Sequence, residues 1–141
     1  MEGSEASSAS RQFRRSVDSL AEIFDFIEGF LAGVALPPAA LHDVQFVVEE
    51  LFTNQVKYAA GNPNPLLLEL RRREGRLEVS LTDFDAEPFD PRSVPDPRVD
   101  LPIEERRPGG LGIYLSKKLV DGIEYEYVDR RSKTTFTKEL S

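Results

Sequence analysis

The central segment of the chain, residues 41–59, reads LHDVQFVVEELFTNQVKYA. Its apolar side chains recur at steps of three and four residues, which is the spacing of one buried helical face. They are Leu41, Val44, Val48, Leu51 and Tyr58, with Val47 and Phe52 widening the stripe. Proline is tolerated in the first turn of a helix, so Pro38 is a suitable start, and the turn-forming residues 61–65 end the element. The segment therefore predicts a long amphipathic helix from Pro38 to about Ala59.

Two shorter helices are predicted before and after this segment. The first is capped by Asp18 or Ser19 and runs to about Leu31. Its apolar positions are Leu20, Ile23, Phe24, Ile27, Phe30 and Leu31, and we expect Phe24, Phe26 and Phe30 to lie in the core. The other runs from about Leu111 to Val120 and is ended by Asp121-Gly122. Its inward positions are Leu111, Ile113, Leu115 and Leu119.

Five strand-like segments account for most of the remaining chain. They cover residues 12–17, 66–73, 76–83, 123–129 and 134–140. In the third, Leu77, Val79 and Leu81 alternate with polar residues, as in a half-buried strand. Glu74-Gly75 suits a two-residue hairpin turn, and residues 130–133 form a second, polar turn. Hairpins pair strands antiparallel, so we predict an α+β fold: a two-layer α/β sandwich whose mixed, mainly antiparallel sheet carries three helices on one face.

Length and composition fit one domain. We expect residues 10–141 to form it and the Ser/Ala/Glu-rich residues 1–9 to be disordered. The chain has 18 basic and 25 acidic residues, a net charge of −7, which disfavours direct binding to nucleic acid. It has no cysteine, one histidine, no recognisable secretory leader and no apolar run long enough for a membrane span. We therefore expect a cytoplasmic protein without disulfides or a multi-histidine metal site.

Polar side chains in the middle of the long helix form the first candidate site. Glu50 and Asn54 are four residues apart and therefore project from the same helical face. An amide oxygen can ligate Mg²⁺, and a neighbouring carboxylate can accept a proton from an attacking hydroxyl group. Lys57, three residues further on, could reach a phosphate. The alternative is an ordinary solvated helix face, which the spacing alone favours.

The residues Pro-Gly-Gly-Leu-Gly at 108–112 form the second candidate site, where the last helix begins. Free N–H groups at a helix start bind anions, and glycines let the backbone approach a phosphate closely. The alternative is a flexible loop end. The preceding loop, residues 84–108, holds six of the ten prolines. A structureless loop of this length in a compact domain is usually functional or disordered, and here it is predicted to cover the site.

In this order and spacing the two candidate sites resemble those of the Bergerat-type (histidine-kinase-like) ATPases, in the branch of anti-sigma-factor serine kinases. The first box of that family is similar to Glu50-x-x-x-Asn54, and its glycine box is similar to Gly109-Gly110-Leu111-Gly112. Pro88-Phe89-Asp90-Pro91 resembles a frequent ending of the middle box. The family also has a threonine near the adenine on its last hairpin, a place that Thr135 (or Thr134) would fill. The resemblance covers most of the chain after residue 10.

The middle box departs from the family pattern, which is Asp-x-Gly with the aspartate reading the adenine amino group. Counting forward along the strand gives Asp83 and Asp85 at these two positions, whereas counting back from Phe89 gives Phe84 and Ala86. We favour Asp83 because it continues the inward phase of its strand, and Asp85 remains the alternative. Either count leaves the glycine missing. A side chain there crowds the purine or requires a positive φ, which Asp tolerates better than most residues, so weaker ATP binding is expected.

The resemblance implies an ATP-binding anti-sigma factor with serine protein kinase activity, dependent on ATP and Mg²⁺. The implied site residues are Glu50 (catalytic), Asn54 (also the Mg²⁺ ligand), Lys57, Asp83, Asp85, Gly109, Gly110, Leu111, Gly112 and Thr135. The implied partners are a sigma factor and an anti-anti-sigma (STAS-type) protein, whose serine receives the γ-phosphate, and the implied assembly is a homodimer. The altered middle box favours an alternative, a catalytically degenerate binding module that sequesters a protein partner without ATP turnover. A third possibility, an ATPase module of a larger signalling complex, is disfavoured because no dimerisation domain with a phosphorylatable histidine is recognisable.

Overall fold

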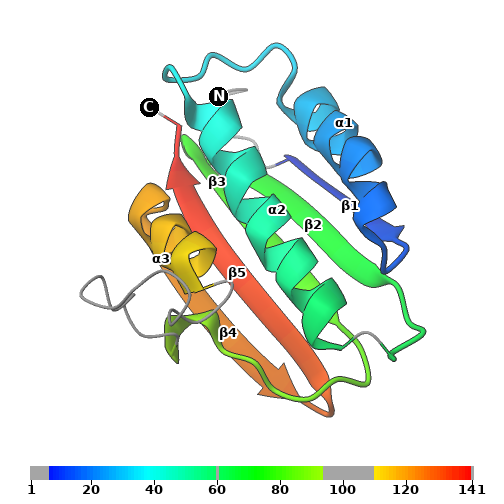
Figure 1. Ribbon diagram of the computed structural model, residues 1–141. Helices are drawn as coiled ribbons and strands as arrows, with labels where there is room; N and C mark the ends of the chain where they lie inside the picture. The colour runs from blue at the N-terminus through cyan, green and yellow to red at the C-terminus, as the bar shows by residue number, and fades with distance from the viewer. Residues whose placement is uncertain (1–6, 60, 94–109, 141) are drawn as a thin grey trace.

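The computed structural model describes residues 7–59, 61–93 and 110–140. Within these ranges the helices and strands follow the predicted order (Figure 1). They are β1 (Ser7–Phe13), the 3₁₀ turn η2 (Val17–Ser19), α1 (Leu20–Leu31), α2 (Ala40–Tyr58), β2 (Leu66–Arg73), β3 (Arg76–Asp83), the 3₁₀ turn η3 (Pro91–Ser93), α3 (Gly110–Leu119), β4 (Gly122–Val128) and β5 (Arg131–Glu139). The predicted bounds of β2 and β3 are confirmed in full, and those of the helices are confirmed apart from small differences at their ends.

The five strands form one sheet in the order β1-β2-β3-β5-β4. All three helices cover the same face of this sheet, and α2 lies over its middle (Figure 1). The predicted α+β two-layer sandwich is therefore confirmed. The sheet is not mixed, however, because every pairing among the described strands is antiparallel.

Two tight hairpin turns fix the register of two strand pairs, β2 with β3 and β4 with β5. Glu74 and Gly75 join β2 to β3 with φ values of 56° and 75°, and Asp129 and Arg130 join β4 to β5 with φ values of 53° and 61°. Positive φ at both central residues matches the twist of a two-residue hairpin. The second turn is shorter than predicted, since β5 begins at Arg131 and takes up residues 131–133.

The first strand lies earlier in the chain than predicted. β1 pairs with β2 from Ser7 opposite Arg72 to Phe13 opposite Leu66. Residues 7–9 therefore belong to the sheet and not to a disordered terminus, while residues 1–6 lie outside the described residues. The predicted strand over residues 12–17 overlaps β1 only at its last two residues, because β1 is a polar edge strand in which Phe13 alone is buried.

The core lies between the sheet and the helices. Its largest fully buried side chains are Phe52, Phe136, Ile23, Ile27, Leu66, Leu68, Leu70, Leu77, Val44, Val47, Val48 and Val79. The predicted core residues Phe24, Phe26 and Phe30 are partly buried against this cluster. Two predicted inward positions are wrong: Tyr58 is 62% exposed and Leu115 is 41% exposed. Tyr58 ends α2, and Leu115 falls off the buried face of α3, which is defined by Ile113 and Ser116.

The long loop after β3 is described up to Ser93, and residues 94–108 of the predicted covering loop lie outside the described residues. Across the described ranges, no helix has both the length and the apolar character needed to span a membrane.

Candidate functional site

The two predicted boxes meet where α2 passes the start of α3. Glu50 lies in the middle of α2, and Gly112 lies in the first turn of α3. A Cβ atom at Gly112 would lie only 1.7 Å from Oε1 of Glu50, so glycine is what leaves room for the carboxylate. The first N–H groups of a helix have no intrahelical partner, which makes this end of α3 suited to an anion. Gly110 and Leu111 form the beginning of the same helix, and Gly109 lies outside the described residues.

The surroundings of Glu50 favour its use as a base. Burial raises the pKa of Glu50 above the ordinary value of a glutamate, and the charge of Glu49 raises it further. The positive charge of Lys57 acts in the opposite sense, which places this exposed lysine within electrostatic reach of Glu50. A carboxylate with a raised pKa accepts a proton more readily near neutral pH.

Asn54 lies one turn after Glu50, at the wall of a small cavity of about 10 Å³ between α2, the sheet and the loop after β3. The cavity is lined by Leu51, Asn54, Gln55, Leu81, Phe89, Pro91, Ser132 and Thr134. The Nδ2 atom of Asn54 is buried without a hydrogen-bond partner among the described residues. Such an atom calls for an explanation, and a ligand is one. Rotation of the amide would present its oxygen instead, which is a donor suited to Mg²⁺.

Acidic and imidazole side chains do not gather into a metal-binding cluster of three or more anywhere in the described ranges. A cation held by Asn54 would therefore take most of its ligands from water and from a bound phosphate. This is the usual coordination of Mg²⁺ in nucleotide sites, so the residues present fit that ion.

Asp83 is fully buried and faces inward, as the alternation along β3 predicted. Its carboxylate is already paired with protein groups. Arg15 forms an ion pair with Oδ1 through Nη2 and lies 3.3 Å from Oδ2 through Nη1, and Nε2 of Gln55 donates to Oδ2 at 2.6 Å. Gln55, and not Asp83, is among the described residues that line the cavity.

The Arg15 side chain contacts three separate parts of the fold. Its side chain is 4% exposed, although it follows the edge strand β1. Besides Asp83, it donates to the backbone carbonyls of Gln55 and Asn64, both at 3.2 Å. The guanidinium group therefore links the end of α2, the turn after it and the end of β3.

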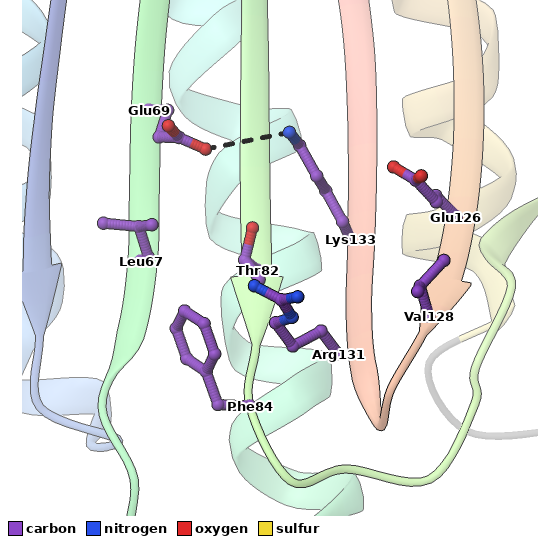
Figure 2. Close-up of a pocket in the computed structure, with 8 residues that line it drawn as sticks. All are labelled: Leu67, Glu69, Thr82, Phe84, Glu126, Val128, Arg131 and Lys133. Atoms are coloured by element: carbon purple, nitrogen blue, oxygen red, sulfur yellow. Dashed lines mark ion pairs between the residues drawn. The ribbon is translucent and has the colours of Figure 1, made fainter.

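The two residues after Asp83, Phe84 and Asp85, lie outside the cavity. Phe84 points to the uncovered face of the sheet, where it lines a pocket of about 310 Å³ with Leu67 and Thr82 (Figure 2). Asp85 has a φ of 54°, a left-handed conformation that glycine adopts more readily than other residues. Counted forward from Asp83, Asp85 stands where the family pattern has its glycine. Its exposed carboxylate pairs with Nε of Arg130 at 2.8 Å, so Asp85 is not positioned to read a base in the cavity.

The loop after β3 closes the cavity with Phe89. The centroids of the Phe89 and Tyr58 rings lie 4.8 Å apart, and the Phe89 N–H donates to the hydroxyl of Tyr125 at 2.9 Å. Small-molecule pockets usually measure about 300–1,000 Å³. The cavity is therefore smaller than an ordinary small-molecule pocket.

Asp90 makes the Phe-Asp-Pro sequence a tight turn. Its carboxylate accepts hydrogen bonds from the Arg92 backbone N–H at 2.9 Å and from Nη2 of the Arg92 guanidinium at 2.8 Å. These bonds with the Arg92 side chain hold the pKa of Asp90 below its ordinary value. The turn η3 follows directly, so Asp90 fixes the backbone on which Phe89 is carried.

Thr135 lies on the wrong side of the sheet for the predicted role. Its hydroxyl is hydrogen-bonded to that of Ser80 at 2.8 Å on the uncovered face. Side chains alternate between faces along a strand, so the neighbouring Thr134 lies on the helix-covered face, where it is buried and lines the cavity. The threonine at the cleft is therefore Thr134, the alternative considered from the sequence.

Sequence reasoning missed Arg15 and Gln55. No spacing rule connects Arg15 with Asp83, because 68 residues separate them. Gln55 did carry a signal, since it lies four residues after Leu51 on the buried face of α2 and is itself buried. A glutamine in an apolar helical stripe indicates a buried polar partner.

Fold and cleft together define a class, the ATPase domains of the histidine kinase type. The family model described as histidine kinase-like ATPase domain matches residues 13–138, which is most of the chain. The chain therefore belongs to this family.

Two curated proteins that are similar to this chain carry the name serine-protein kinase. A protein named serine-protein kinase RsbW from Halalkalibacterium halodurans is 31% identical over 90 residues, which are 60% of this chain and 54% of the relative. A protein of the same name from Listeria innocua is 28% identical over 121 residues, 82% of this chain and 76% of the relative. The chain thus spans about half of the first relative and three quarters of the second.

The fold is similar to that of a solved structure, the RsbU and RsbW domains of a Mycobacterium tuberculosis protein. The TM-score is 0.67 over 95% of this chain and 32% of that one, at 12% sequence identity. At this identity the similarity concerns the fold alone.

Proposed function

We propose that this protein is an anti-sigma factor with serine protein kinase activity, which binds Mg²⁺-ATP at the cavity beside Asn54 and at the start of α3. It transfers the γ-phosphate to a serine of an anti-anti-sigma (STAS-type) protein and, as a cytoplasmic homodimer, sequesters a sigma factor in the same pathway. The observation that carries the proposal is the contact of the Glu50 carboxylate with the start of α3 at Gly112. It brings a candidate base next to a helix start suited to phosphate.

The roles of the residues follow from their chemistry. The serine oxygen forms a bond to the γ-phosphorus while the bond to the β-phosphate oxygen breaks, and Glu50 accepts the hydroxyl proton. N–H groups of Gly110 and Gly112 hold phosphate oxygens, and Lys57 adds positive charge. Asn54 would hold Mg²⁺, which neutralises phosphate charge when it is bound.

A second candidate function is the binding module without ATP turnover. Two observations favour it: the cavity measures about 10 Å³, and the Asp83 carboxylate is engaged by Arg15 and Gln55. In this case the protein would bind a regulator in the same way with or without nucleotide.

Incubation of the full chain with γ-labelled Mg-ATP and a cognate STAS-type protein distinguishes the two candidates. The kinase proposal predicts a phosphoserine on the partner, identified by mass spectrometry. If the partner binds but carries no phosphate, the kinase proposal is wrong and the binding module remains.

Replacement of Gly112 by alanine should lower the rate of phosphoryl transfer without lowering the stability of the fold. Alanine favours a helix over glycine by about 0.5–1 kcal/mol, and the Glu50 side chain can rotate away from the new Cβ. We therefore expect unchanged or higher thermal stability but at least about a tenfold slower phosphoryl transfer, because the base is displaced.

The matched control for this variant is Gly29→Ala. Gly29 also lies in a helix, α1, and a Cβ there would meet nothing within 4 Å apart from its chain neighbours and the backbone of its own helix. It should gain similar stability and keep full transfer activity. Equal activities of the two variants would contradict the role given to the contact between Glu50 and Gly112.

A further inference from the structure

Gln55 stands between the buried Asp83 and the cavity. It follows Asn54 on α2, and its side chain is buried at the cavity wall. In the family pattern the aspartate itself meets the adenine, whereas here a glutamine amide lines the cavity in its place. The identity of the base-reading group therefore depends on how this amide is held.

The orientation of the Gln55 amide is fixed by its partner. Asp83, paired with the Arg15 guanidinium, presents acceptor oxygens only. The end of the amide that faces Asp83 must therefore be the nitrogen, in agreement with the 2.6 Å bond from Nε2 to Oδ2. The oxygen Oε1 is left over, and no hydrogen bond among the described residues ends on it. This oxygen is therefore open to a donor other than the described residues.

Asp83 itself has little capacity left for a ligand. Its Oδ1 accepts from Nη2 of Arg15, and its Oδ2 accepts from both Nη1 of Arg15 and Nε2 of Gln55. Its exposed fraction is 1%. A base could reach this carboxylate only by breaking the bonds that hold Gln55 and Arg15 in place.

We propose that Gln55, and not Asp83, determines base specificity in this protein, by accepting the exocyclic N6–H of adenine at Oε1. The inference rests on the proposed nucleotide binding and deepens it. A neutral acceptor replaces the charged one, so adenine is still preferred over a purine that lacks the amino group. The preference is set by one neutral hydrogen bond, which corresponds to about a tenfold difference in affinity.

The test compares two nucleotides on matched variants of the full chain. Binding of Mg-ATP and of the Mg complex of purine riboside triphosphate, which lacks the 6-amino group, is measured by calorimetry for wild type, Gln55→Ala and Gln55→Leu. The leucine variant refills the volume that alanine leaves, and thermal unfolding shows that each variant is folded. The control is Gln45→Ala, because Gln45 lies on the same helix but bonds to Glu28 at 3.1 Å.

Wild type and Gln45→Ala should prefer ATP by about tenfold, and in a folded Gln55 variant the preference should fall to about onefold. A folded Gln55 variant that keeps the wild-type preference overturns this inference and returns the role to Asp83. Equal binding of the two nucleotides by wild type also overturns the inference but leaves the proposed function standing. Absence of any nucleotide binding by wild type overturns both.

Discussion

Replacing Glu50 by glutamine is expected to slow phosphoryl transfer by about a hundredfold or more. The amide keeps the shape of the side chain but cannot accept the serine proton, and general-base catalysis contributes rate factors of about 10²–10⁴. Nucleotide binding should persist, because the helix start at Gly112 and the Asn54 amide are unchanged. The measurement is single-turnover transfer from labelled ATP to the partner protein. Glu49→Gln is the control: it removes the adjacent carboxylate and should retain most of the rate.

The raised pKa of Glu50 gives this prediction a pH dependence. A base acts in its deprotonated form, so wild-type transfer should decline as the pH falls through the raised pKa, and Glu50→Gln should lack this decline. The effect on stability has a definite sign. Because the pKa is raised in the folded state, the stabilising contribution of Glu50 is present below its unfolded pKa and is lost as the pH rises through the folded value. At neutral pH the glutamine variant should thus be at least as stable as wild type, and a clear loss of stability would contradict the burial of Glu50.

Replacing Arg15 by methionine is expected to destabilise the fold by about 3–5 kcal/mol, since a buried carboxylate is left without its counter-charge. The ion pair is almost completely buried, with side chains 4% and 1% exposed, so screening by solvent is small. Chemical denaturation of wild type and variant measures the difference. Arg14→Met is the control, because Arg14 is exposed and should change stability by no more than about 0.5 kcal/mol.

A double variant tests the cause of this loss. Arg15→Met combined with Asp83→Asn removes both charges, so stability should recover in part relative to Arg15→Met alone. An additive, larger loss in the double variant would mean that the other hydrogen bonds of Arg15, to the carbonyls of Gln55 and Asn64, carry the effect.

The fold could be predicted well where local pattern and final burial agree. The alternation of Leu77, Val79 and Leu81 located β3, and the Glu74-Gly75 turn located its hairpin. β1 could not be found in this way, because an edge strand that buries little more than Phe13 has no apolar alternation. It becomes a strand through its pairing with β2, which is a tertiary interaction.

The candidate site could be predicted where the spacing of two residues places them on the same face of a helix. Glu50 and Asn54 share such a face, and motif order correctly brought Glu50 to Gly112. Face assignment failed for Thr135 because a shift of one residue along β5 reverses the side of the sheet. The engagement of Asp83 could not be foreseen, since it depends on Arg15, which is distant in sequence and comes close only in the folded chain.

Calorimetric titration of the full chain with Mg-ADP tests the central claim most directly, namely that the cleft beside Asn54 and the start of α3 holds a magnesium-bound nucleotide. We expect saturable binding that depends on Mg²⁺ and is lost in Asn54→Leu, while the stability of that variant is unchanged or higher because the unpartnered Nδ2 atom is removed. Absence of heat from the wild-type protein even at millimolar nucleotide, or full binding by Asn54→Leu, would contradict the account.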